Sequence, residues 1–205
     1  MSTQWGTGRQ ALIEATADVL RTGGEIQVKE VAAAAGVSHT LIYRHFPDGG
    51  KDELIAEAYA HLFKGLAEAD IDSLFAVLQS AGPDPEAIGR FIVTVLNPRR
   101  SAVRWARLEA LAQSRSNPFV AERVEAVRVE LVRDFAERLR VLEPGLTQNS
   151  ATALSIFSQA LPFGVTAMGG QSMSKALREE IASMWAEALV HLLTRAKASS
   201  SPSSR

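Results

Sequence analysis

The chain has 205 residues, of which 46% are hydrophobic and 22% charged, and its formal net charge at pH 7 is −1. This length suits one medium-sized domain or a small domain joined to a larger one, and the composition is that of a globular protein rather than a disordered one. The absence of cysteine excludes disulfides, thiolate metal sites and cysteine nucleophiles. No apolar run approaches the roughly 20 residues of a membrane span, and the first residues show no secretion signal. We therefore expect a cytoplasmic protein with no membrane partner.

Helical periodicity dominates the chain and strand alternation is nearly absent, which predicts an all-α fold. The first helix is expected to end at Gly23 and Gly24, and the second at Gly36. Ser38 stands where the N-cap of the third helix is expected, because its hydroxyl can accept a hydrogen bond from an unpaired backbone N–H. The first three helices are expected over residues 8–22, 27–35 and 38–45. Together they would form a small N-terminal domain over residues 1–50.

The rest of the chain is also expected to be helical, as one domain over residues 51–198. Asp70 and Asp72 are interpreted as part of a loop-rich stretch that reaches to Pro85. The expected helices cover residues 51–67 (a connecting helix), 86–96 and 100–114, then a long one from Pro118 to near Pro144, and two more on either side of Gly169 and Gly170. Residues 199–205 are polar and serine-rich, which predicts a disordered tail.

Residues 27–46 have the pattern of a helix-turn-helix, with two short helices joined by a turn centred on Gly36. In that motif the second helix lies in the major groove of DNA with its N-terminal residues toward the base edges. Ile42 and Phe46 are four residues apart and are expected to anchor its opposite face. A plain helical hairpin with polar residues facing water would have the same pattern. The charges of the first 51 residues balance, so electrostatics alone does not decide between the two.

The segment VAAAAGVSHTLIYRHFPDGGKDELI, which begins at Val31, resembles the signature of TetR family repressors. The resemblance covers roughly the first 60 residues of the 205, and beyond them the chain is similar to that family only in its length and helical character. It implies a helix-turn-helix domain followed by a helical domain for ligand binding and dimerisation. The positions that fit the family frame, identically or conservatively, are Val31, Ala32, Ala35, Gly36, Val37, Ser38, Ile42, Tyr43, His45, Phe46, Lys51 and Leu54.

The sequence departs from the family frame at a few positions of the motif. Thr40 stands where glycine is usual, and Leu41 stands where a threonine often makes a polar contact. Gly49 and Gly50 lengthen the turn that precedes Lys51. The base-reading surface and the reach of that lysine are therefore expected to be particular to this chain.

Side-chain chemistry assigns roles on the expected recognition helix. Tyr43, His45 and Lys51 are suited to phosphate oxygens, because phenol, imidazole and ammonium groups all donate hydrogen bonds. Arginine pairs with guanine more specifically than other side chains do, so Arg44 is expected at a base edge together with its polar neighbours. The candidate DNA-binding residues are Ser38, His39, Thr40, Tyr43, Arg44, His45 and Lys51. Packing of Tyr43, a helix-end role for His45 and a solvated Arg44 remain the alternatives.

A palindromic operator is expected to be bound by a two-fold homodimer. The resemblance implies that the last two helices of each chain form a four-helix bundle across the two-fold axis. Small residues beside large ones on both helices would allow close approach. The expected interface consists of Leu154, Phe157, Leu161, Ile181, Trp185 and Ala188. The alternative is that these apolar residues only complete the core of one chain.

Pro162 lies inside the first of these two helices, where it should kink the helix or leave a carbonyl unpaired, as often happens beside a cavity. We expect a pocket for an apolar or amphipathic ligand, anionic if an arginine points inward. Its expected lining consists of Arg104, Trp105, Phe157, Phe163 and Met168. Aromatic and methionine side chains at helical spacing are more often core residues.

The sequence contains no motif of an enzyme. A Gly-rich phosphate loop, H-E-x-x-H and G-x-S-x-G are all absent, and the four histidines show no metal-ligand spacing. We therefore expect no catalytic residue, no metal and no cofactor. The predicted function is sequence-specific transcriptional regulation by a repressor that an unidentified small-molecule effector releases from operator DNA. The alternative is a helical small-molecule-binding protein or enzyme that does not use its helix-turn-helix for operator binding.

Overall fold

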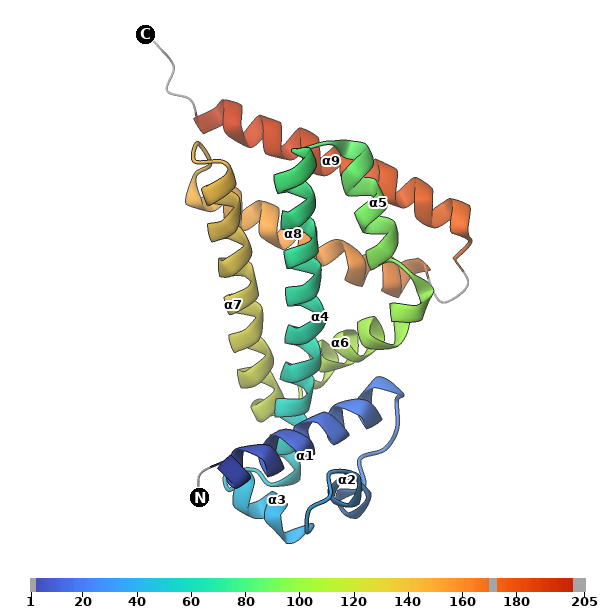
Figure 1. Ribbon diagram of the computed structural model, residues 1–205, viewed down its shortest axis with the longest axis vertical. Helices are drawn as coiled ribbons and strands as arrows, with labels where there is room; N and C mark the ends of the chain where they lie inside the picture. The colour runs from blue at the N-terminus through green and yellow to red at the C-terminus, as the bar shows by residue number, and fades with distance from the viewer. Residues whose placement is uncertain (1–2, 170–172, 201–205) are drawn as a thin grey trace. The chain divides into compact units, whose positions relative to one another are not determined.

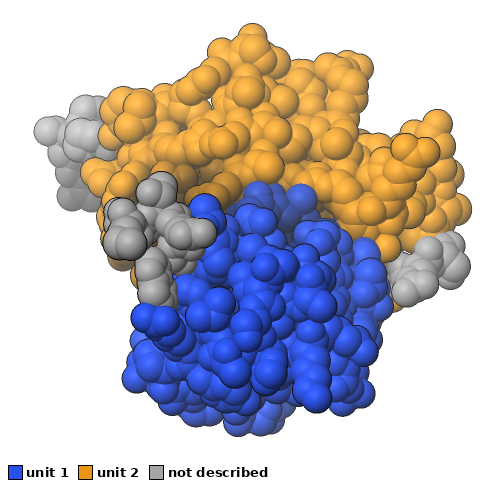
Figure 2. Space-filling view, turned by 60° about the horizontal axis from the view of Figure 1, so that its bottom comes forward, with its two compact units in different colours: residues 1–66, 102–128 blue, residues 67–101, 129–205 orange. Residues whose placement is uncertain are grey.

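The structure is a computed structural model that describes residues 3–169 and 173–200. Within these ranges the chain forms helices and no strand, which confirms the predicted all-α class (Figure 1). The chain divides into two compact units, coloured separately in Figure 2. Unit 1 consists of residues 1–66 and 102–128, and unit 2 of residues 67–101 and 129–205. The two units are defined by compactness, so they do not test the functional boundary expected after residue 50, which stays a prediction.

Unit 1 is built from the N-terminal helices and the segments that pack on them. Its helices are α1 (Thr3–Arg21), α2 (Val28–Ala34), α3 (Thr40–His45), the start of α4 (Lys51–Ala81), α6 (Ser101–Gln113) and the start of α7 (Pro118–Leu142). Leu12, Ile42 and Phe46 are fully buried at its centre. A second apolar cluster joins α1, α4 and α6 through Ala17, Ala58, Leu62 and Ala106. The predicted helix-turn-helix therefore shares its unit with residues far along the sequence.

Unit 2 contains the remainder of α4 and α7 with the C-terminal helices. Its other helices are α5 (Pro85–Val95), the short 3-10 helix η1 (Pro98–Arg100), α8 (Gln148–Gly169) and α9 (Lys175–Ser200). The rings of Phe75 on α4 and Phe135 on α7 meet edge to face, with 5.1 Å between centroids. Helices α5 and α9 approach closely beside Gly89, where an added Cβ would lie 3.9 Å from the Cβ of Ala186. Small residues permit such close packing of helices.

The connecting helix is longer than predicted. Helix α4 continues to Ala81, so Asp70 and Asp72 are helical and the prediction of a loop there was wrong. Ile71, Leu74 and Phe75 are buried and continue the apolar face of the helix, which outweighs the weak helix propensity of aspartate. Both aspartates are held by arginines, with Arg100 Nη2 2.6 Å from Asp70 and Arg138 Nη1 2.7 Å from Asp72.

Helix ends differ from the prediction at both ends of the chain. Helix α1 begins at Thr3 rather than at residue 8, so its N-terminal end is longer than predicted. Helix α9 ends at Ser200, so the first two residues of the expected tail are helical and the prediction of disorder was wrong for them. The remaining tail residues, 201–205, lie outside the described part of the chain.

Helix α8 is more apolar than expected from the sequence. An 18-residue window of it reaches a mean hydropathy of 1.2, enough for a membrane span by length and composition alone, and 28% of that window is buried. The statement that no apolar segment approaches a membrane span was therefore wrong for α8, although core helices of soluble proteins pass the same test. The helix continues past Pro162, whose carbonyl accepts a hydrogen bond from Thr166 Oγ1 at 2.7 Å.

Candidate nucleic-acid interface

Helix α3 divides into a buried face and an exposed face. Ile42 and Phe46, the two anchors predicted from their spacing, are fully buried. Tyr43 is 62% exposed, and the structure also places Ser38, His39, Thr40 and Arg44 on the exposed surface of this segment. The polar candidates are thus presented together by a helix whose opposite face is fixed in the core.

The angle between α2 and α3 depends on Gly36. This residue has φ of +67°, a conformation that L-residues with a side chain rarely adopt. The N–H of Gly36 donates to the carbonyl of Ala33 at 3.1 Å, and that of Val37 to the carbonyl of Ala32 at 2.9 Å. These bonds satisfy carbonyls at the end of α2 and turn the chain toward α3.

The start of α3 differs from the prediction. Its N-cap is His39, and no side chain caps this helix end, so the assignment of Ser38 as the N-cap was wrong. Instead, the Ser38 and Thr40 hydroxyls lie 2.9 Å apart and hydrogen-bond to each other. Both residues are exposed, so their hydroxyls remain accessible from the surface.

The lengthened turn before α4 is fixed by a buried carboxylate. Glu53 Oε2 accepts hydrogen bonds from the backbone N–H groups of Asp48 at 3.1 Å and Gly49 at 3.2 Å. The Gly50 N–H donates to the carbonyl of Phe46 at 2.8 Å. The turn therefore has a defined shape and leaves Lys51 exposed at the first position of α4. Glu53 was missed in the sequence, although a glutamate at the third position of a helix is a known signal for such capping.

The surroundings of His45 at the end of α3 favour its neutral form. Burial lowers the pKa of His45 below its usual 6.5, and the positive charges of Arg9 and Arg44 lower it further. The lowered pKa favours the neutral imidazole, which has a single N–H to donate. A phosphate beside it would favour the protonated form and act against these effects.

Sequence comparison identifies this segment. The family model for bacterial regulatory proteins of the tetR family matches residues 12–58, from the middle of α1 through the first turns of α4. Residues 12–58 therefore match the tetR family of regulatory proteins. This match confirms the resemblance drawn from the motif and supports transcriptional regulation through DNA binding as the general function. No curated protein matches the sequence at a significant level.

Solved structures extend the similarity of fold beyond the DNA-binding domain. A crystal structure assigned to the TetR family of transcriptional regulators, from Mesorhizobium loti MAFF303099, superimposes with a TM-score of 0.65 at 17% identity, covering 93% of this chain and 98% of that one. Another TetR-family assignment, from Rhodococcus sp., gives a TM-score of 0.60 at 17% identity, covering 90% and 99%. The described C-terminal helices thus follow a TetR-type fold.

The predicted ligand residues are divided between the units. Arg104 and Trp105 lie on α6 in unit 1, whereas Phe157, Phe163 and Met168 lie on α8 in unit 2. Arg104 is buried, and Met168 is the most exposed of the five. The structure therefore does not assemble these residues within one unit.

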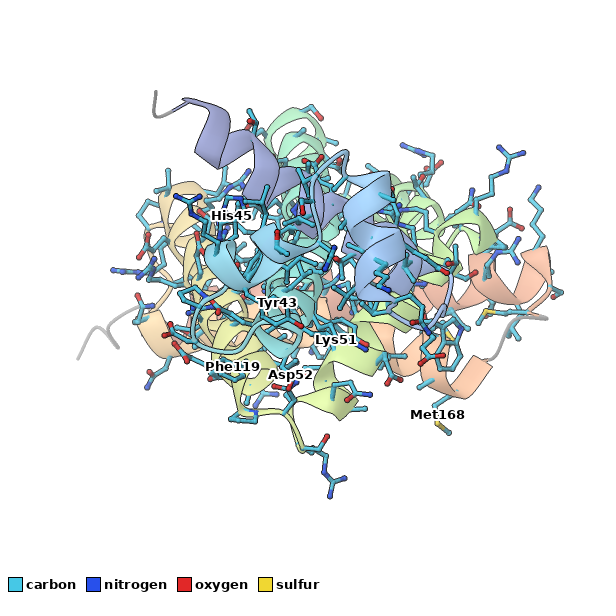
Figure 3. All side chains as sticks on the ribbon, turned by 90° about the horizontal axis from the view of Figure 1, so that it is seen from below. Tyr43, His45, Lys51, Asp52, Phe119 and Met168 are labelled. Carbon is cyan, nitrogen blue, oxygen red and sulfur yellow. The ribbon has the colours of Figure 1, made fainter. Side chains whose placement is uncertain are left out.

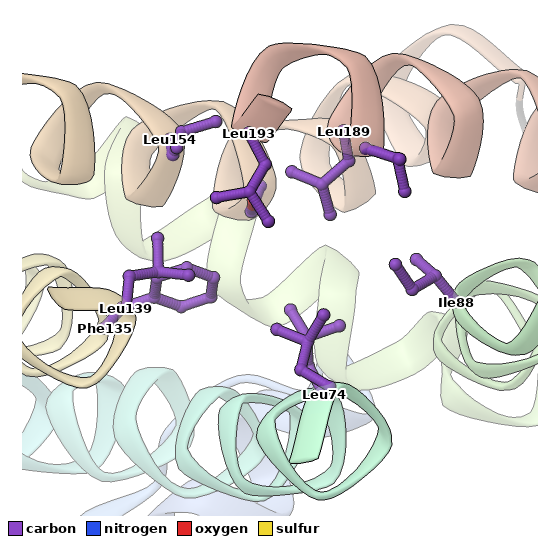
Figure 4. Close-up of a pocket in the computed structure, with 10 residues that line it drawn as sticks. Leu74, Ile88, Phe135, Leu139, Leu154, Leu189 and Leu193 are labelled. Carbon is purple, nitrogen blue, oxygen red and sulfur yellow. The ribbon is translucent and has the colours of Figure 1, made fainter. Parts of the chain in front are cut away.

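A small apolar cavity lies within unit 2 (Figure 4). Its volume of about 10 Å³ is room for about one water molecule. Ser158 is among the residues that line it, and the Ser158 hydroxyl is buried without a hydrogen-bond partner. Pro162 has no N–H to donate to the carbonyl of Ser158 four residues earlier. The residues around the cavity are Leu74, Leu78, Ile88, Phe135, Leu139, Leu154, Ser158, Leu189, Val190 and Leu193, none of which was predicted to bind ligand.

The predicted dimer residues occupy different environments. Leu154 and Trp185 are buried within one chain, while Leu161, Ile181 and Ala188 are half-buried. Phe157 is partly exposed, and its ring lies 6.4 Å from that of Trp185. Other large apolar side chains on these helices are exposed, namely Ile156, Met168, Leu177 and Met184.

Proposed function

We propose that the protein is a sequence-specific transcriptional regulator in which α3 enters the major groove of operator DNA. The observation that carries this proposal is the division of α3, with two anchors in the core and its polar side chains exposed. Tyr43, His45 and Lys51 would contact phosphates, while His39, Thr40 and Arg44 would face base edges, with Ser38 at the entry of the helix. Phosphate contacts set position and base contacts set sequence preference. Residues 1–50 would supply the DNA contacts and residues 51–198 the other functions.

Substitutions should separate the two kinds of contact. We expect Lys51→Ala to weaken binding to all DNA and to reduce the slope of log K against log[salt] by about 0.9, because one phosphate contact is lost. Arg44→Ala should instead cost about 1–3 kcal/mol of discrimination at particular base pairs. Binding of each variant to a site selected from random DNA and to its scrambled version measures both effects.

Two controls make this experiment decisive. Tyr43→Ala should weaken binding to both DNAs without changing the salt slope, because it removes a hydrogen-bond donor and no cation. Arg90→Ala removes an exposed arginine on α5 in unit 2 and should change nothing. Unchanged affinities for Tyr43→Ala and Lys51→Ala together would show that α3 does not bind DNA in this way.

We propose that the regulator acts in the cytoplasm as a homodimer on a palindromic site, through α8 and α9. Ile156 and Phe157 on α8 and Leu177 and Met184 on α9 are large apolar residues exposed in the single chain. Only 28% of the apolar window of α8 is buried. A self-complementary interface would cover these residues in both copies and place the two α3 helices for half-sites about 34–36 Å apart.

We further propose that it is a repressor without enzymatic activity, released from DNA by a small-molecule effector. The described residues hold no group of three or more His, Asp or Glu that could bind a metal ion. The apolar cavity of unit 2 is too small for an effector unless the surrounding helices shift. Such a shift would couple effector binding to DNA binding. The candidates named from the sequence stay proposals within each unit, Arg104 and Trp105 in unit 1 and Phe157, Phe163 and Met168 in unit 2.

Linkage gives the effector proposal a quantitative test. An effector that releases operator must itself bind more weakly when operator is present, by the same factor. We expect a coupling of about 1–3 kcal/mol, or roughly 5- to 150-fold in affinity. Compounds that raise the unfolding temperature of the protein would be titrated calorimetrically with and without operator. Equal affinities in both titrations for every stabilising compound would contradict release by an effector.

A further inference from the structure

The turn between α3 and α4 lies between two aromatic rings of unit 1. On one side, a Cβ built on Gly50 would lie 3.1 Å from both Cδ1 and Cε1 of Tyr43. On the other side, a Cβ built on Gly49 would lie only 2.7 Å from Cζ of Phe119 and 2.8 Å from its Cε2. Figure 3 shows Tyr43, Lys51 and Phe119 around this turn. The two glycines that lengthen the turn are therefore the residues that let both rings lie against its backbone.

Hydrogen bonds fix the backbone of this turn between the two rings. The side chain of Glu53 is only 6% exposed and accepts hydrogen bonds from the backbone N–H groups of Asp48 and Gly49. Gly50 has φ of +55°, so replacing it would strain the backbone as well as press on Tyr43. Two of the three atoms nearest to the Cβ position of Gly49 belong to Phe119, at the start of α7.

A second connection joins α7 to the end of α3 by charge. Arg123, one turn after Phe119, places Nε 3.1 Å from Oε1 of Glu57 on α4. The same oxygen lies 2.8 Å from Nη2 of Arg9 on α1. The guanidinium of Arg9 in turn lies over the ring of Phe46, 5.0 Å from its centroid. Phe119 and Arg123 therefore hold the start of α7 against the DNA-binding motif at two points.

We propose that Phe119 is a positioning residue for DNA binding, which holds the Tyr43 ring in its DNA-contacting orientation through the Gly49–Gly50 turn. This inference rests on the proposed function, because the orientation of Tyr43 matters to binding only if Tyr43 contacts DNA. It places a determinant of DNA affinity more than 60 residues beyond the family match, which ends at residue 58. A change in the position of α7 within unit 1 would then alter the phosphate-binding surface directly.

The first test reads the orientation of Tyr43 in the free protein. The chain has two tyrosines, Tyr43 and Tyr59, so fluorotyrosine labelling gives two fluorine resonances, which Tyr43→Phe assigns. We expect Phe119→Ala to shift the Tyr43 resonance and leave that of Tyr59 in place. Phe91→Ala, which removes another half-buried phenylalanine but in unit 2, is the matched control and should shift neither. An unmoved Tyr43 resonance in Phe119→Ala would overturn the proposal.

The second test is a double-mutant cycle on DNA affinity. Phe119→Ala should weaken binding to selected and scrambled DNA about two- to tenfold, the effect of losing one hydrogen bond to phosphate. In a Tyr43→Ala background the same change should have no further effect, since Phe119 acts through Tyr43. An equal loss in both backgrounds would overturn the proposal. Phe119→Leu keeps most of the apolar volume and replaces Phe119→Ala if thermal unfolding shows that the latter does not fold.

The two tests also separate this inference from the proposed function. If Tyr43→Ala leaves DNA affinity unchanged, the proposed phosphate contact is wrong, and positioning by Phe119 has no effect on binding. The fluorine spectrum of the free protein still reports whether Phe119 holds the ring. If Tyr43→Ala weakens binding and Phe119→Ala does not, the DNA-binding proposal stands and the positioning role fails.

Discussion

Ile156→Asp is expected to convert the protein to a monomer and to abolish tight binding to a palindromic operator. Ile156 is 51% exposed on α8, so a carboxylate there should be tolerated by a single folded chain. In the proposed interface it would be buried without a partner, at a cost of about 3–5 kcal/mol for each copy. Two copies face each other across a two-fold axis, so the penalty applies twice. Light scattering on the purified variant measures its mass directly.

A matched substitution tests whether the effect belongs to this surface. Val141 on α7 is 80% exposed and also belongs to unit 2, so Val141→Asp adds the same charge at another exposed apolar position. This control should remain dimeric and bind operator normally. A dimeric Ile156→Asp protein with unchanged thermal unfolding would place the interface elsewhere.

Phe46→Ala is expected to cause the largest loss of stability in unit 1. Phe46 is fully buried at the end of α3, and truncating a phenylalanine in such a core costs about 3–5 kcal/mol through lost burial and the cavity left behind. The ring under Arg9 is removed as well. Urea unfolding followed by circular dichroism should show a lower transition midpoint.

Tyr43→Ala is the control for Phe46→Ala, because it truncates an aromatic residue three positions earlier. Tyr43 is exposed, so its loss should change the free energy of unfolding by less than about 1 kcal/mol. The two variants should therefore differ in kind, one losing stability and the other losing DNA affinity. Equal unfolding midpoints would mean that α3 is not anchored as the structure shows.

The general architecture could be predicted because its signals are local. Glycines that end helices, and apolar residues spaced along one face, are visible in a single sequence. The buried pair Ile42 and Phe46 followed from their spacing alone. The length of α4 was not predicted, because its aspartates were interpreted as loop residues. What keeps Asp70 and Asp72 helical is the apolar face beside them and two arginines, one of them 66 residues away along the chain.

The candidate site could be predicted only in part. Exposed donors on α3 were named from their position, but the residues that hold them were missed. Glu53 acts on the backbone of a turn, and Phe119 reaches that turn from a helix about 70 residues later in the sequence. Such long-range contacts leave no periodic signal. The residues around the cavity could not be predicted from the sequence for the same reason, because a cavity depends on how several helices pack.

The composition of unit 1 has a consequence for how the protein is made. The unit combines residues 1–66 with residues 102–128, so the partners of Ala58 and Phe63 on α6 are synthesised well after α4 itself. Domains that assemble during synthesis wait for the last segment that completes their core. Helices α1 to α3 are synthesised before α6 and α7, yet unit 1 can reach its final packing only after residue 128 has been made. Until then the apolar residues of α1 and α4 that pack on α6 are left uncovered, and transiently exposed apolar surface of this kind promotes aggregation.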